Sequence, residues 1–348
     1  MNTIIINKRQ ISVNNPTYII AEMSANHNKN FDKAVKIIEE AKKAGADAIK
    51  LQTYTPDTIT LDSDNEYFKI KDTIWKGKTL YQLYKEAFTP WEWQPRLKKI
   101  ADDLKIDLFS TPFDASAIDF LEKMDVPAYK IASFELIDTP LLKRVAATGK
   151  PLILSTGMAA MDEIKDAVNA LREKKGVEFA LLKCTSAYPA SPEEANLRTI
   201  PHLSETFKVP AGLSDHTMGS TVAIAAVALG ACIIEKHFCL DRKDSGPDSS
   251  FSMEPDEFKQ MVNDIRTTEK ALGKISYELT ENQKKSKAFR RSLFSVEDIK
   301  EGELLTEKNI RSIRPGDGLP PKYLEAILGK KARIDIQKGI PLRWDSFR

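Results

Sequence analysis

The chain has 348 residues, of which 52 are Lys or Arg and 50 are Asp or Glu, so its formal charge is only +2. This near balance argues against nucleic acid or an acidic membrane as the main partner. Three cysteines, an odd number in a long chain, do not suggest a secreted disulfide framework. The first residues lack a signal-peptide pattern, and the longest apolar run, 222–230, is too short to cross a bilayer, so we expect a soluble cytoplasmic protein.

Short apolar runs of strand length alternate with segments of helical periodicity along most of the chain. Residues 3–6 and 10–13 predict a β-hairpin. Further strands are expected at 18–22 and 47–52 and in runs that end near Ser110, Lys130, Ser155, Lys183, Leu213 and His237. Helices are expected at 31–44, 115–124, 138–148, 161–174, 195–206 and 219–229. Eight strands alternating with helices over roughly 250 residues indicate an α/β fold, the (β/α)8 TIM barrel, although a doubly wound open sheet has the same alternation.

One connection is unusually long, from Gln52 to the strand near Leu108, and it contains Tyr54 and Trp75. Long connections at the catalytic face of a barrel usually carry function. We expect this excursion either to cover a substrate or to be a decoration of the fold.

The chain changes character after residue 272. Residues 273–288 are polar and lysine-rich and predict a linker between a barrel domain, 1–272, and a small module, 289–348. In the module, 298–305 resembles 335–342, with Gly302 and Gly339 at matching positions, which is typical of a short two-fold β structure. About sixty residues are marginal alone, so we expect the module to pack on something.

Polar side chains gather at the predicted carboxyl ends of the strands, which meet at one face of a barrel and form its site. Lysines and hydroxyls suit phosphate and carboxylate groups, although a single lysine there is often a surface charge or a packed stem. The set is Glu22, Lys50, Gln52, Thr111, Lys130, Ser133, Glu135, Ser155, Lys183, Ser186, Ser214, Asp215, His216 and His237.

Two of the four histidines, His216 and His237, end consecutive predicted strands. Either alone would usually be a hydrogen-bonded structural residue, but a pair at adjacent strand ends suits a divalent metal with open positions for water or substrate. Imidazole plus oxygen ligands admit Mn²⁺, Mg²⁺ and Co²⁺. Glu22 is a carboxylate that could move a proton. Cys184 is expected to be a buried thiol without an adjacent base.

At these positions the sequence resembles the sialic acid synthases over nearly the whole chain. The motifs that carry the resemblance are Ile20-Ala-Glu-Met-Ser-Ala-Asn-His27, Ile49-Lys-Leu-Gln-Thr53, Phe109-Ser-Thr-Pro-Phe113, Ala128-Tyr-Lys-Ile-Ala-Ser133, Leu154-Ser-Thr-Gly157, Lys183-Cys-Thr-Ser186, Gly212-Leu-Ser-Asp-His216 and Glu235-Lys-His237. The tail, with Ile313-Arg-Pro-Gly-Asp-Gly318, is similar to their C-terminal antifreeze-like (SAF) β-clip domain.

The resemblance implies a transferase that condenses phosphoenolpyruvate with the open-chain aldehyde of a 2-acetamido sugar and water, releasing phosphate and a nine-carbon nonulosonic acid. It implies that His216 and His237 hold Mn²⁺ or a similar ion and act in catalysis with Glu22. The implied phosphoenolpyruvate-binding residues are Lys50, Thr111, Lys130, Ser133, Ser155, Ser186 and Ser214. The implied sugar-binding residues are Gln52, Tyr54, Glu135, Glu235, Asp248 and Arg314. Arg314 matches an arginine that the family inserts into the partner subunit's barrel, which implies a domain-swapped homodimer.

Within the family, the long excursion resembles the pseudaminic acid synthase branch, as does Thr89-Pro-Trp-Glu-Trp93. The acceptor would then be 2,4-diacetamido-2,4,6-trideoxy-L-altrose, whose methyl and acetyl groups suit an aromatic lining from the excursion. N-acetylneuraminate synthases differ here and place an asparagine where this chain has Ser186. An N-acetylneuraminate or legionaminate synthase that uses a mannose-type sugar is the alternative within the family.

Three readings outside the family stay open. A Schiff-base aldolase would use Lys50, Lys130 or Lys183 and would work in chelator. A metallohydrolase barrel usually has more metal ligands than this chain offers on its first strand. A non-catalytic protein would bind a glycan through the C-terminal module alone, but candidate residues stand at every matched strand end.

Overall fold

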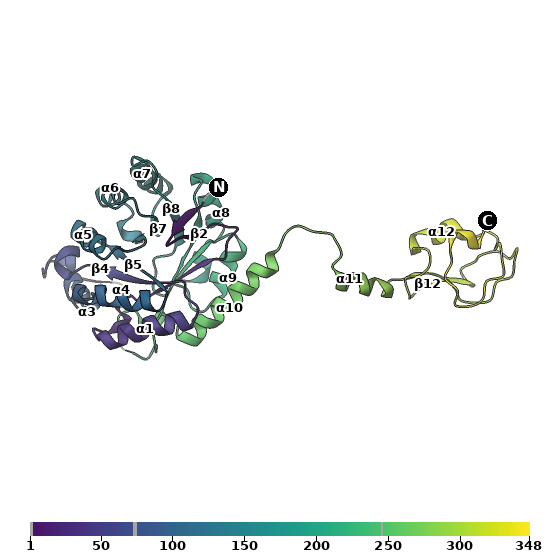
Figure 1. Ribbon diagram of the computed structural model, residues 1–348, viewed down its shortest axis with the longest axis horizontal. Coiled ribbons are helices and arrows are strands. Elements are labelled where there is room, and N and C mark those ends of the chain that lie inside the picture. The colour runs from purple at the N-terminus through teal and green to yellow at the C-terminus, as the bar shows by residue number, and fades with distance from the viewer. Residues whose placement is uncertain (1–2, 72–74, 245) are drawn as a thin grey trace. The chain divides into compact units, whose positions relative to one another are not determined.

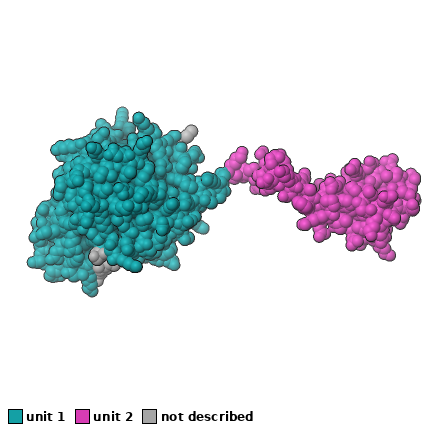
Figure 2. Space-filling model, turned by 60° about the horizontal axis from the view of Figure 1, so that its bottom comes forward, with its two compact units in different colours: residues 1–273 teal, residues 274–348 magenta. Residues whose placement is uncertain are grey.

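The computed structural model describes residues 3–71, 75–244 and 246–348. The chain divides into two compact units, 1–273 and 274–348, coloured separately in Figure 2. The first unit is a closed barrel of eight parallel strands in the order β10-β3-β4-β5-β6-β7-β8-β9, ringed by helices (Figure 1). The barrel predicted from the alternation is therefore confirmed, and the open sheet is excluded.

The barrel strands are short and buried on both faces, as parallel strands under a helical layer are. They are β3 Tyr18–Glu22, β4 Ala48–Thr53, β5 Asp107–Pro112, β6 Tyr129–Ile131, β7 Leu152–Ser155, β8 Phe179–Cys184, β9 Ala211–Asp215 and β10 Ile233–His237. The last strand closes against the first in register, with His237 beside Glu22. This closure brings residues from the two ends of the barrel sequence to one face.

The outer helices form where apolar residues recur every three or four positions. In α1, Phe31–Lys43, the buried residues Ala34, Ile37, Ile38 and Ala41 make one stripe, and the Asn30 side chain accepts a hydrogen bond from the Lys33 amide at its start. The others are α4 Gln94–Asp103, α5 Ala115–Lys123, α6 Thr139–Ala147, α7 Met161–Arg172, α8 Thr199–Phe207, α9 Thr221–Ala228 and α10 Pro255–Leu272. Among the described residues, no helix is long and apolar enough to span a membrane.

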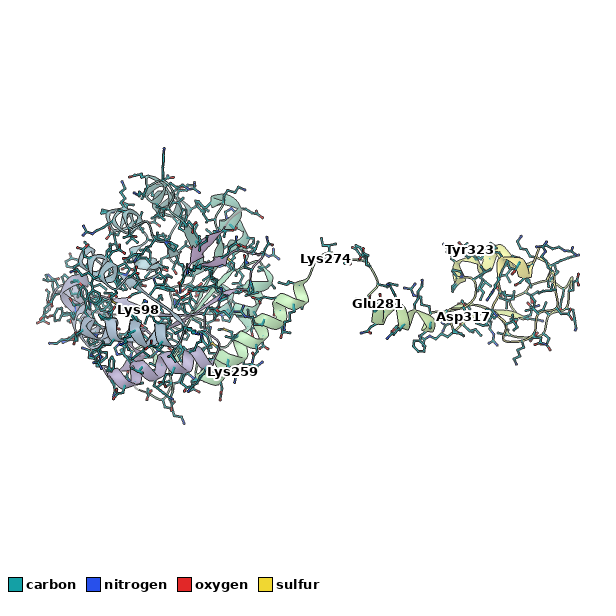
Figure 3. The ribbon with its side chains drawn as sticks, viewed as in Figure 1. Lys98, Lys259, Lys274, Glu281, Asp317 and Tyr323 are labelled. Carbon is teal, nitrogen blue, oxygen red and sulfur yellow. The ribbon has the colours of Figure 1, made fainter. Side chains whose placement is uncertain are left out.

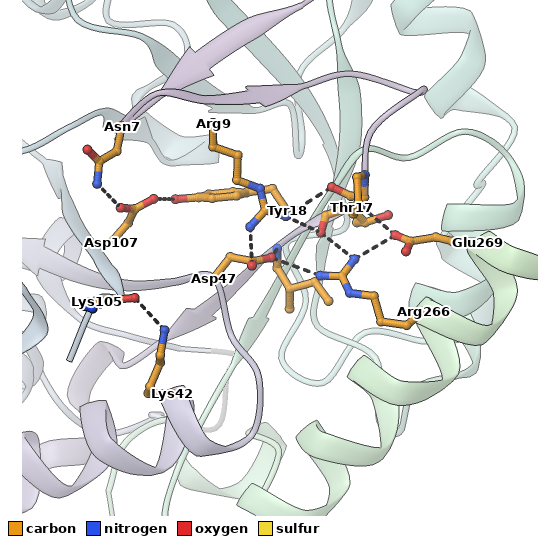
Figure 4. Close-up of polar contacts among 12 residues, drawn as sticks. Asn7, Arg9, Thr17, Tyr18, Lys42, Asp47, Lys105, Asp107, Arg266 and Glu269 are labelled. Atoms are coloured by element: carbon orange, nitrogen blue, oxygen red, sulfur yellow. Dashed lines mark hydrogen bonds and ion pairs between the residues drawn. The ribbon is translucent and has the colours of Figure 1, made fainter.

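The predicted hairpin, β1 Ile4–Ile6 and β2 Arg9–Ile11, lies near the amino ends of the strands. Figure 4 shows the polar contacts there. Arg9 and Arg266 both pair with Asp47, and Asp47 also accepts from the Ile19 amide at 2.9 Å. The hairpin and α10 are thereby joined to the end of the barrel that lies opposite the candidate site.

The excursion after β4 contains α2 Pro56–Ile59, η2 Glu66–Phe68, α3 Leu80–Ala87 and η3 Trp91–Trp93, and its residues 72–74 lie outside the described part of the chain. Buried polar contacts fix its two ends. Thr53 Oγ1 lies 2.8 Å from Gln94 Oε1, and His27 Nε2 lies 3.0 Å from Thr89 Oγ1. Trp93 packs edge-on against His27.

Short 3-10 turns follow several strands, and one of them, η4, carries Ser133 and Glu135 of the candidate set. The turns are η1 Ser24–His27, η4 Ser133–Glu135, η5 Pro192–Glu194 and η6 Ser249–Phe251. One prediction needs correction: α8 begins at Thr199, whereas periodicity had placed its start at residue 195. Pro192 starts the separate turn η5 there, and residues 195–198 form a loop between the turn and the helix.

The second unit has its own small core, and in it the two halves of the sequence repeat pair with each other. Ile299 and Ile336 exchange backbone hydrogen bonds of 2.8 Å in both directions. Asp298 accepts from the Lys338 amide at 2.8 Å, and Asp335 accepts from the Glu301 amide at 2.9 Å. The elements are β11 Ser292–Ser295, β12 Ile310–Ile313, η8 Pro321–Tyr323, α12 Leu324–Ile327 and η9 Trp344–Ser346.

The polar segment before this core is not entirely irregular. It contains α11, Glu281–Ser286, followed by η7, Lys287–Phe289, and Figure 3 labels Lys274 and Glu281 along it. Thr280 and Gln283 form a capping box at the start of α11. That signature is readable in the sequence, but the surrounding lysines favoured a linker.

Candidate active site

Strand alternation selects which residues face the barrel interior. Glu235 and His237 of β10 point inward, and so does Ser214 of β9, whose Oγ donates to Glu235 Oε1 at 3.2 Å. His216 follows β9 directly and faces the same side. Side chains from the last two strands of the barrel therefore meet at its carboxyl end.

A buried cluster of charges occupies the centre of this end. Lys50 Nζ lies 2.8 Å from Glu22 Oε2 and 3.1 Å from Glu235 Oε1, and all three side chains are at most 6% exposed. Burial opposes the charge on Lys50, but the two carboxylates outweigh it and raise its pKa. Burial raises the pKa of Glu22 although Lys50 opposes the rise. For Glu235, burial is outweighed by Lys130 and Lys50, which lower its pKa.

A second buried lysine lies beside this cluster. Lys130 Nζ donates to Ser155 Oγ at 2.6 Å and to the Ile131 carbonyl at 3.0 Å, and it lies 3.8 Å from Glu235 Oε1. Burial lowers the pKa of Lys130 to about 8, although Glu235 opposes the shift. Two lysines are here matched by two carboxylates, so an anion that binds the lysines must compete with Glu22 and Glu235 for them.

Several hydroxyl groups lie close to Lys130. Ser133 Oγ accepts from the Gly157 amide at 3.1 Å. A Cβ at Gly157 would lie 2.3 Å from Ser186 Oγ and 2.7 Å from Ser133 Oγ, so a larger residue fits there only if both hydroxyls move. Thr111 Oγ1 is buried and has no hydrogen-bond partner among the described residues. We call these hydroxyls the cradle, and as directed donors they suit the oxygens of a small anion. Sequence reasoning quoted Gly157 in a motif but gave it no role.

The two histidines face each other. Their ring centroids are 5.4 Å apart, with an interplanar angle of 63°. His216 Nδ1 lies 2.8 Å from the Thr185 carbonyl, which can only accept, so Nδ1 carries the proton and Nε2 keeps its lone pair. Burial, with His216 and Lys50 adding to it, lowers the pKa of His237 far below its usual value. His237 Nδ1 is buried without a partner in the described residues.

These two imidazoles fit a divalent ion. Each offers a nitrogen lone pair, and His216 is oriented by its hydrogen bond to the Thr185 carbonyl. The part of the chain that the structure describes has no group of three or more His, Cys, Asp or Glu arranged for a metal. An ion held here would therefore take its remaining ligands from water or substrate, as ions in open catalytic sites do.

Cys184 is closer to the site than its sequence neighbours suggested. Its Sγ lies 3.9 Å from His216 Nδ1 and 3.8 Å from Ser186 Oγ. Burial opposes its ionisation, but contacts with His216 outweigh burial and lower the pKa of the thiol to about 6. The thiol is buried, as expected, but its environment is polar. No sequence signal places His216 beside it, because the contact joins two different strands.

Carboxylates and aromatic rings border the opening of the site. Asp248 accepts from the Ser24 hydroxyl, and Glu135 Oε2 is buried without a partner in the described residues. Burial raises the pKa of Glu135 to about 7. Gln52 lies two residues beyond Lys50 on the same strand face. Tyr54 is buried between Tyr84 and Phe113, at centroid distances of 5.5 and 5.1 Å.

Tyr188, which sequence reasoning missed, covers the histidines. Its ring centroid is 4.4 Å from that of His216 and 5.9 Å from that of Trp75. Trp75 in turn donates from Nε1 to the Pro247 carbonyl at 3.2 Å. The excursion therefore reaches the site through an aromatic contact. Tyr188 precedes a proline in an irregular loop, a context that gave no periodic signal.

Two residues of the set expected to converge on the site face away from it. Asp215 forms a buried ion pair with Lys236, whose side chain points to the opposite face of β10 from Glu235. The side chain of Cys184 points inward, so that of Lys183, one residue earlier on the strand, points outward. Lys183 Nζ donates to the Cys184 carbonyl at 2.8 Å. Lys183 is therefore not a candidate for a Schiff base. Arg314 is exposed in the second unit.

The other two histidines have different surroundings. His27 is buried against Thr89, and burial lowers its pKa to about 4, so it is a neutral structural residue. His202 is exposed on α8. Of the four histidines, only His216 and His237 therefore lie at the face where the strand ends converge.

A closed (β/α)8 barrel with buried lysines, carboxylates, hydroxyls and facing imidazoles at its strand ends defines a barrel enzyme for small polar substrates. The NeuB family model matches residues 37–277, and the SAF domain model matches 290–348. The chain therefore belongs to the NeuB family and ends in a SAF domain.

Individual relatives agree. The chain is 47% identical to the pseudaminic acid synthase of Campylobacter jejuni strain 81-176, over 95% of this chain and 96% of that protein. It is 38% identical to the N,N'-diacetyllegionaminic acid synthase of C. jejuni strain NCTC 11168, over 94% and 99%. The crystal structure of N-acetylneuraminic acid synthetase from Leptospira borgpetersenii superposes with a TM-score of 0.73 at 34% identity, over 82% of this chain and 94% of that one.

Proposed function

We propose that this chain is a pseudaminic acid synthase. It condenses phosphoenolpyruvate with 2,4-diacetamido-2,4,6-trideoxy-L-altrose and water to give pseudaminic acid and phosphate. The observation that carries the proposal is the buried pair of lysines beside a hydroxyl-lined cradle and two facing imidazoles. The branch is supported by the identity of 47% to a pseudaminic acid synthase, against 38% to a legionaminic acid synthase.

Phosphoenolpyruvate carries a phosphate and a carboxylate, and the interior offers charge and directed donors for both. Lys50 and Lys130 supply the positive charge, and their release from Glu22, Glu235 and Ser155 would accompany binding. The hydroxyls of Thr111, Ser133, Ser155, Ser186 and Ser214 bind the remaining oxygens.

His216 and His237 hold Mn²⁺, with Mg²⁺ and Co²⁺ as alternatives. When bound, the ion supplies a Lewis acid for the aldehyde oxygen of the sugar. Glu22 lies on the strand beside His237 and holds or releases a proton near the reacting carbon. Its raised pKa keeps both protonation states accessible nearer to neutral pH than an exposed carboxylate would. Carbon C3 of phosphoenolpyruvate adds to the aldehyde carbon, water adds to C2, and phosphate leaves with its bridging oxygen, so the C–O bond breaks and the 2-keto acid forms.

The sugar lies at the opening of the barrel. Gln52, Glu135, Glu235 and Asp248 are the polar groups available to its hydroxyls and amides. Tyr188 and Trp75 present an aromatic wall at the same opening, and Tyr54 is packed behind it. A trideoxy sugar with a methyl and two acetyl groups suits such a wall better than a sugar with a free 6-hydroxyl.

The working enzyme is a cytoplasmic homodimer in which Arg314 of one subunit completes the site of the other. Two features support this proposal. The second unit is joined through a polar segment in which Ile275 and Tyr277 are almost fully exposed. Arg314 is also exposed, and an arginine is well suited to contact a sugar amide and carboxylate. Light scattering of the purified full chain at micromolar concentration should give twice the mass of 39.1 kDa, and a monomeric mass would contradict the dimer.

The reaction is tested by measuring phosphate release from phosphoenolpyruvate with Mn²⁺. Parallel acceptors are 2,4-diacetamido-2,4,6-trideoxy-L-altrose, its mannose-configured epimer and N-acetylmannosamine. We expect release with the altrose sugar, abolished by a chelator and restored by Mn²⁺. Release only with a mannose-type sugar would keep the chemistry and overturn the branch.

A Schiff-base aldolase would behave in the opposite way. It would retain activity in chelator, and borohydride would trap a keto acid on Lys50 or Lys130. The His237→Ala variant separates the two, because it should lose release entirely in the proposed mechanism. An unchanged His237→Ala enzyme would exclude the metal role of that histidine.

A further inference from the structure

A buried ion pair lies between the barrel wall and its helical layer, directly behind the two facing histidines. Asp215 and Lys236 occupy the same rung of the β9–β10 ladder, and each immediately precedes one of the histidines. Both side chains are 1% exposed, and Lys236 Nζ lies 2.6 Å from Asp215 Oδ2. The outward positions of barrel strands ordinarily carry apolar residues, because helices cover them. Charged residues are almost never fully buried unless they are paired.

The pair also holds the short corner that contains His216. Lys236 Nζ donates to the Thr217 carbonyl at 2.6 Å. Asp215 Oδ1 accepts from the Thr217 amide at 2.9 Å and from its hydroxyl at 2.8 Å. The residues before and after His216 are thus tied to each other and to the strand that ends in His237.

This corner needs such support because His216 lies one residue beyond the end of β9. The β9–β10 ladder ends at Asp215 and Lys236, so ladder hydrogen bonds do not fix the His216 backbone relative to His237. The amide of Ala190 reaches the His216 carbonyl at 3.0 Å from the opposite side. Lys236 is the group that connects this corner to the strand of the other histidine.

Stability alone is a weak reason for a buried ion pair. The loss of hydration on burying two charges often exceeds their attraction, and apolar replacements of similar volume are often neutral or stabilising. The contacts of the pair at this rung point to a geometric reason, because they hold the corner next to the two imidazoles. Groups behind metal-binding residues commonly set the orientation of those residues.

We propose that Lys236, with Asp215, is a positioning residue that sets the separation and orientation of His216 and His237 for one divalent ion. The inference rests on the metal role in the proposed function and adds two residues that do not touch substrate. It explains why Asp215 points away from the site although it immediately precedes a histidine of the site.

The test compares Mn²⁺ binding, followed by electron paramagnetic resonance, and the visible absorption of bound Co²⁺ in the full chain. Lys236→Met leaves the buried Asp215 carboxylate without its cation and thereby favours misfolding, so the double variant Asp215→Asn/Lys236→Met is measured beside it. The double variant removes both charges and keeps an oxygen for the Thr217 amide. We expect the double variant to melt close to the wild type, to bind Mn²⁺ about 10–100-fold more weakly and to show an altered Co²⁺ band.

Arg9→Met is the matched control, because it breaks the Arg9–Asp47 ion pair at the opposite end of the barrel (Figure 4). It should lower the melting temperature and leave Mn²⁺ affinity and the Co²⁺ band unchanged. If the double variant binds Mn²⁺ as the wild type does, the positioning role is overturned and the metal site stands. If the wild type itself binds neither ion, the metal role and this inference are both overturned.

Discussion

At the scale of single residues, Glu135 shows how burial becomes a measurable pH dependence. Its pKa is raised to about 7 by burial, while in the unfolded chain it is close to 4.5. Between these values the folded state binds more protons than the unfolded state, so stability falls as pH rises through this window. Above about pH 7, Glu135 is charged in both states, and the full cost of burying its charge lowers the stability of the folded state.

Glu135→Gln should therefore stabilise the barrel in a pH-dependent way. Relative to the wild type, we expect little change at pH 4.5 and a gain that grows to at most about 3 kcal/mol near pH 7 and then stays constant. Urea unfolding of the barrel transition at pH 5 and pH 8 measures this difference. Glu205→Gln, at an exposed position of α8, is the control and should show no such trend. A gain in the free energy of unfolding that is equal at pH 5 and pH 8 would show that burial does not raise the pKa of Glu135.

Gly157 tests the anion cradle at the same scale. In Gly157→Ala the new Cβ would meet the hydroxyls of Ser186 and Ser133, which can rotate away without disturbing the backbone. We expect KM for phosphoenolpyruvate to rise about tenfold, or about 1.4 kcal/mol, with a small change in melting temperature. Gly149→Ala is the converse control: nothing crowds it, but its φ of +76° makes alanine strained, so it should lose stability and keep KM. An unchanged KM in Gly157→Ala would remove the cradle from the phosphoenolpyruvate site.

At the scale of elements, the excursion after β4 is joined to the site through Trp75. Its indole nitrogen donates to the Pro247 carbonyl, one residue before Asp248, and its ring contacts Tyr188. Trp75→Phe removes the hydrogen bond and keeps a ring. We expect KM for the acceptor sugar to rise several-fold and KM for phosphoenolpyruvate to stay constant, which steady-state kinetics with each substrate varied in turn would measure.

Trp75→Ala should be more severe, because Tyr188 then also loses its aromatic neighbour. Tyr67→Ala lies on the same excursion with its side chain 89% exposed and should change neither constant. If Trp75→Ala leaves the acceptor KM unchanged, the excursion is a decoration and the sugar lining lies elsewhere. If it raises both constants equally, Trp75 supports the whole site and does not select the sugar.

The elements also show what the sequence could and could not predict. Periodicity located every barrel strand, since buried parallel strands are short apolar runs, and strand ends gathered Glu22, Lys50 and both histidines correctly. It did not separate inward from outward residues, because a run that is apolar on both faces has no alternation. Lys183 and Asp215 were therefore placed in the site, where strand parity excludes them. Cys184 and Tyr188 were missed as neighbours of His216, because those contacts depend on how β8, β9 and the following loop meet in space.

At the scale of the whole molecule, the chain contains two units with separate cores. The internal repeat predicted the structure of the second unit well, because its two halves pair through Ile299 and Ile336. What joins the units was less predictable, since the capping box that starts α11 lies in a lysine-rich stretch. Ile275, Tyr277 and Leu279 alternate along the irregular part of this segment. Alternating apolar residues outside any core suggest a surface that another chain covers.

A mixing experiment tests whether the second unit completes the site of another subunit. Arg314→Ala and His237→Ala should each be inactive alone, the first for lack of a sugar contact and the second for lack of a metal ligand. In a domain-swapped mixed dimer, the intact barrel of the Arg314→Ala chain receives the intact Arg314 of the other chain. Phosphate release should therefore reappear after the two variants are unfolded together and refolded.

A mixture of Glu22→Gln with His237→Ala, unfolded and refolded in the same way, is the control. Both changes lie in the barrel, so no pairing of the two chains gives an intact barrel. The control should stay inactive whatever the arrangement of subunits. If Arg314 instead completed the site of its own chain, the intact barrel of the Arg314→Ala chain would have no arginine. The first mixture would then stay inactive as well. If phosphate release returns in the first mixture and not in the control, the barrel and the second unit of one chain must belong to different active sites.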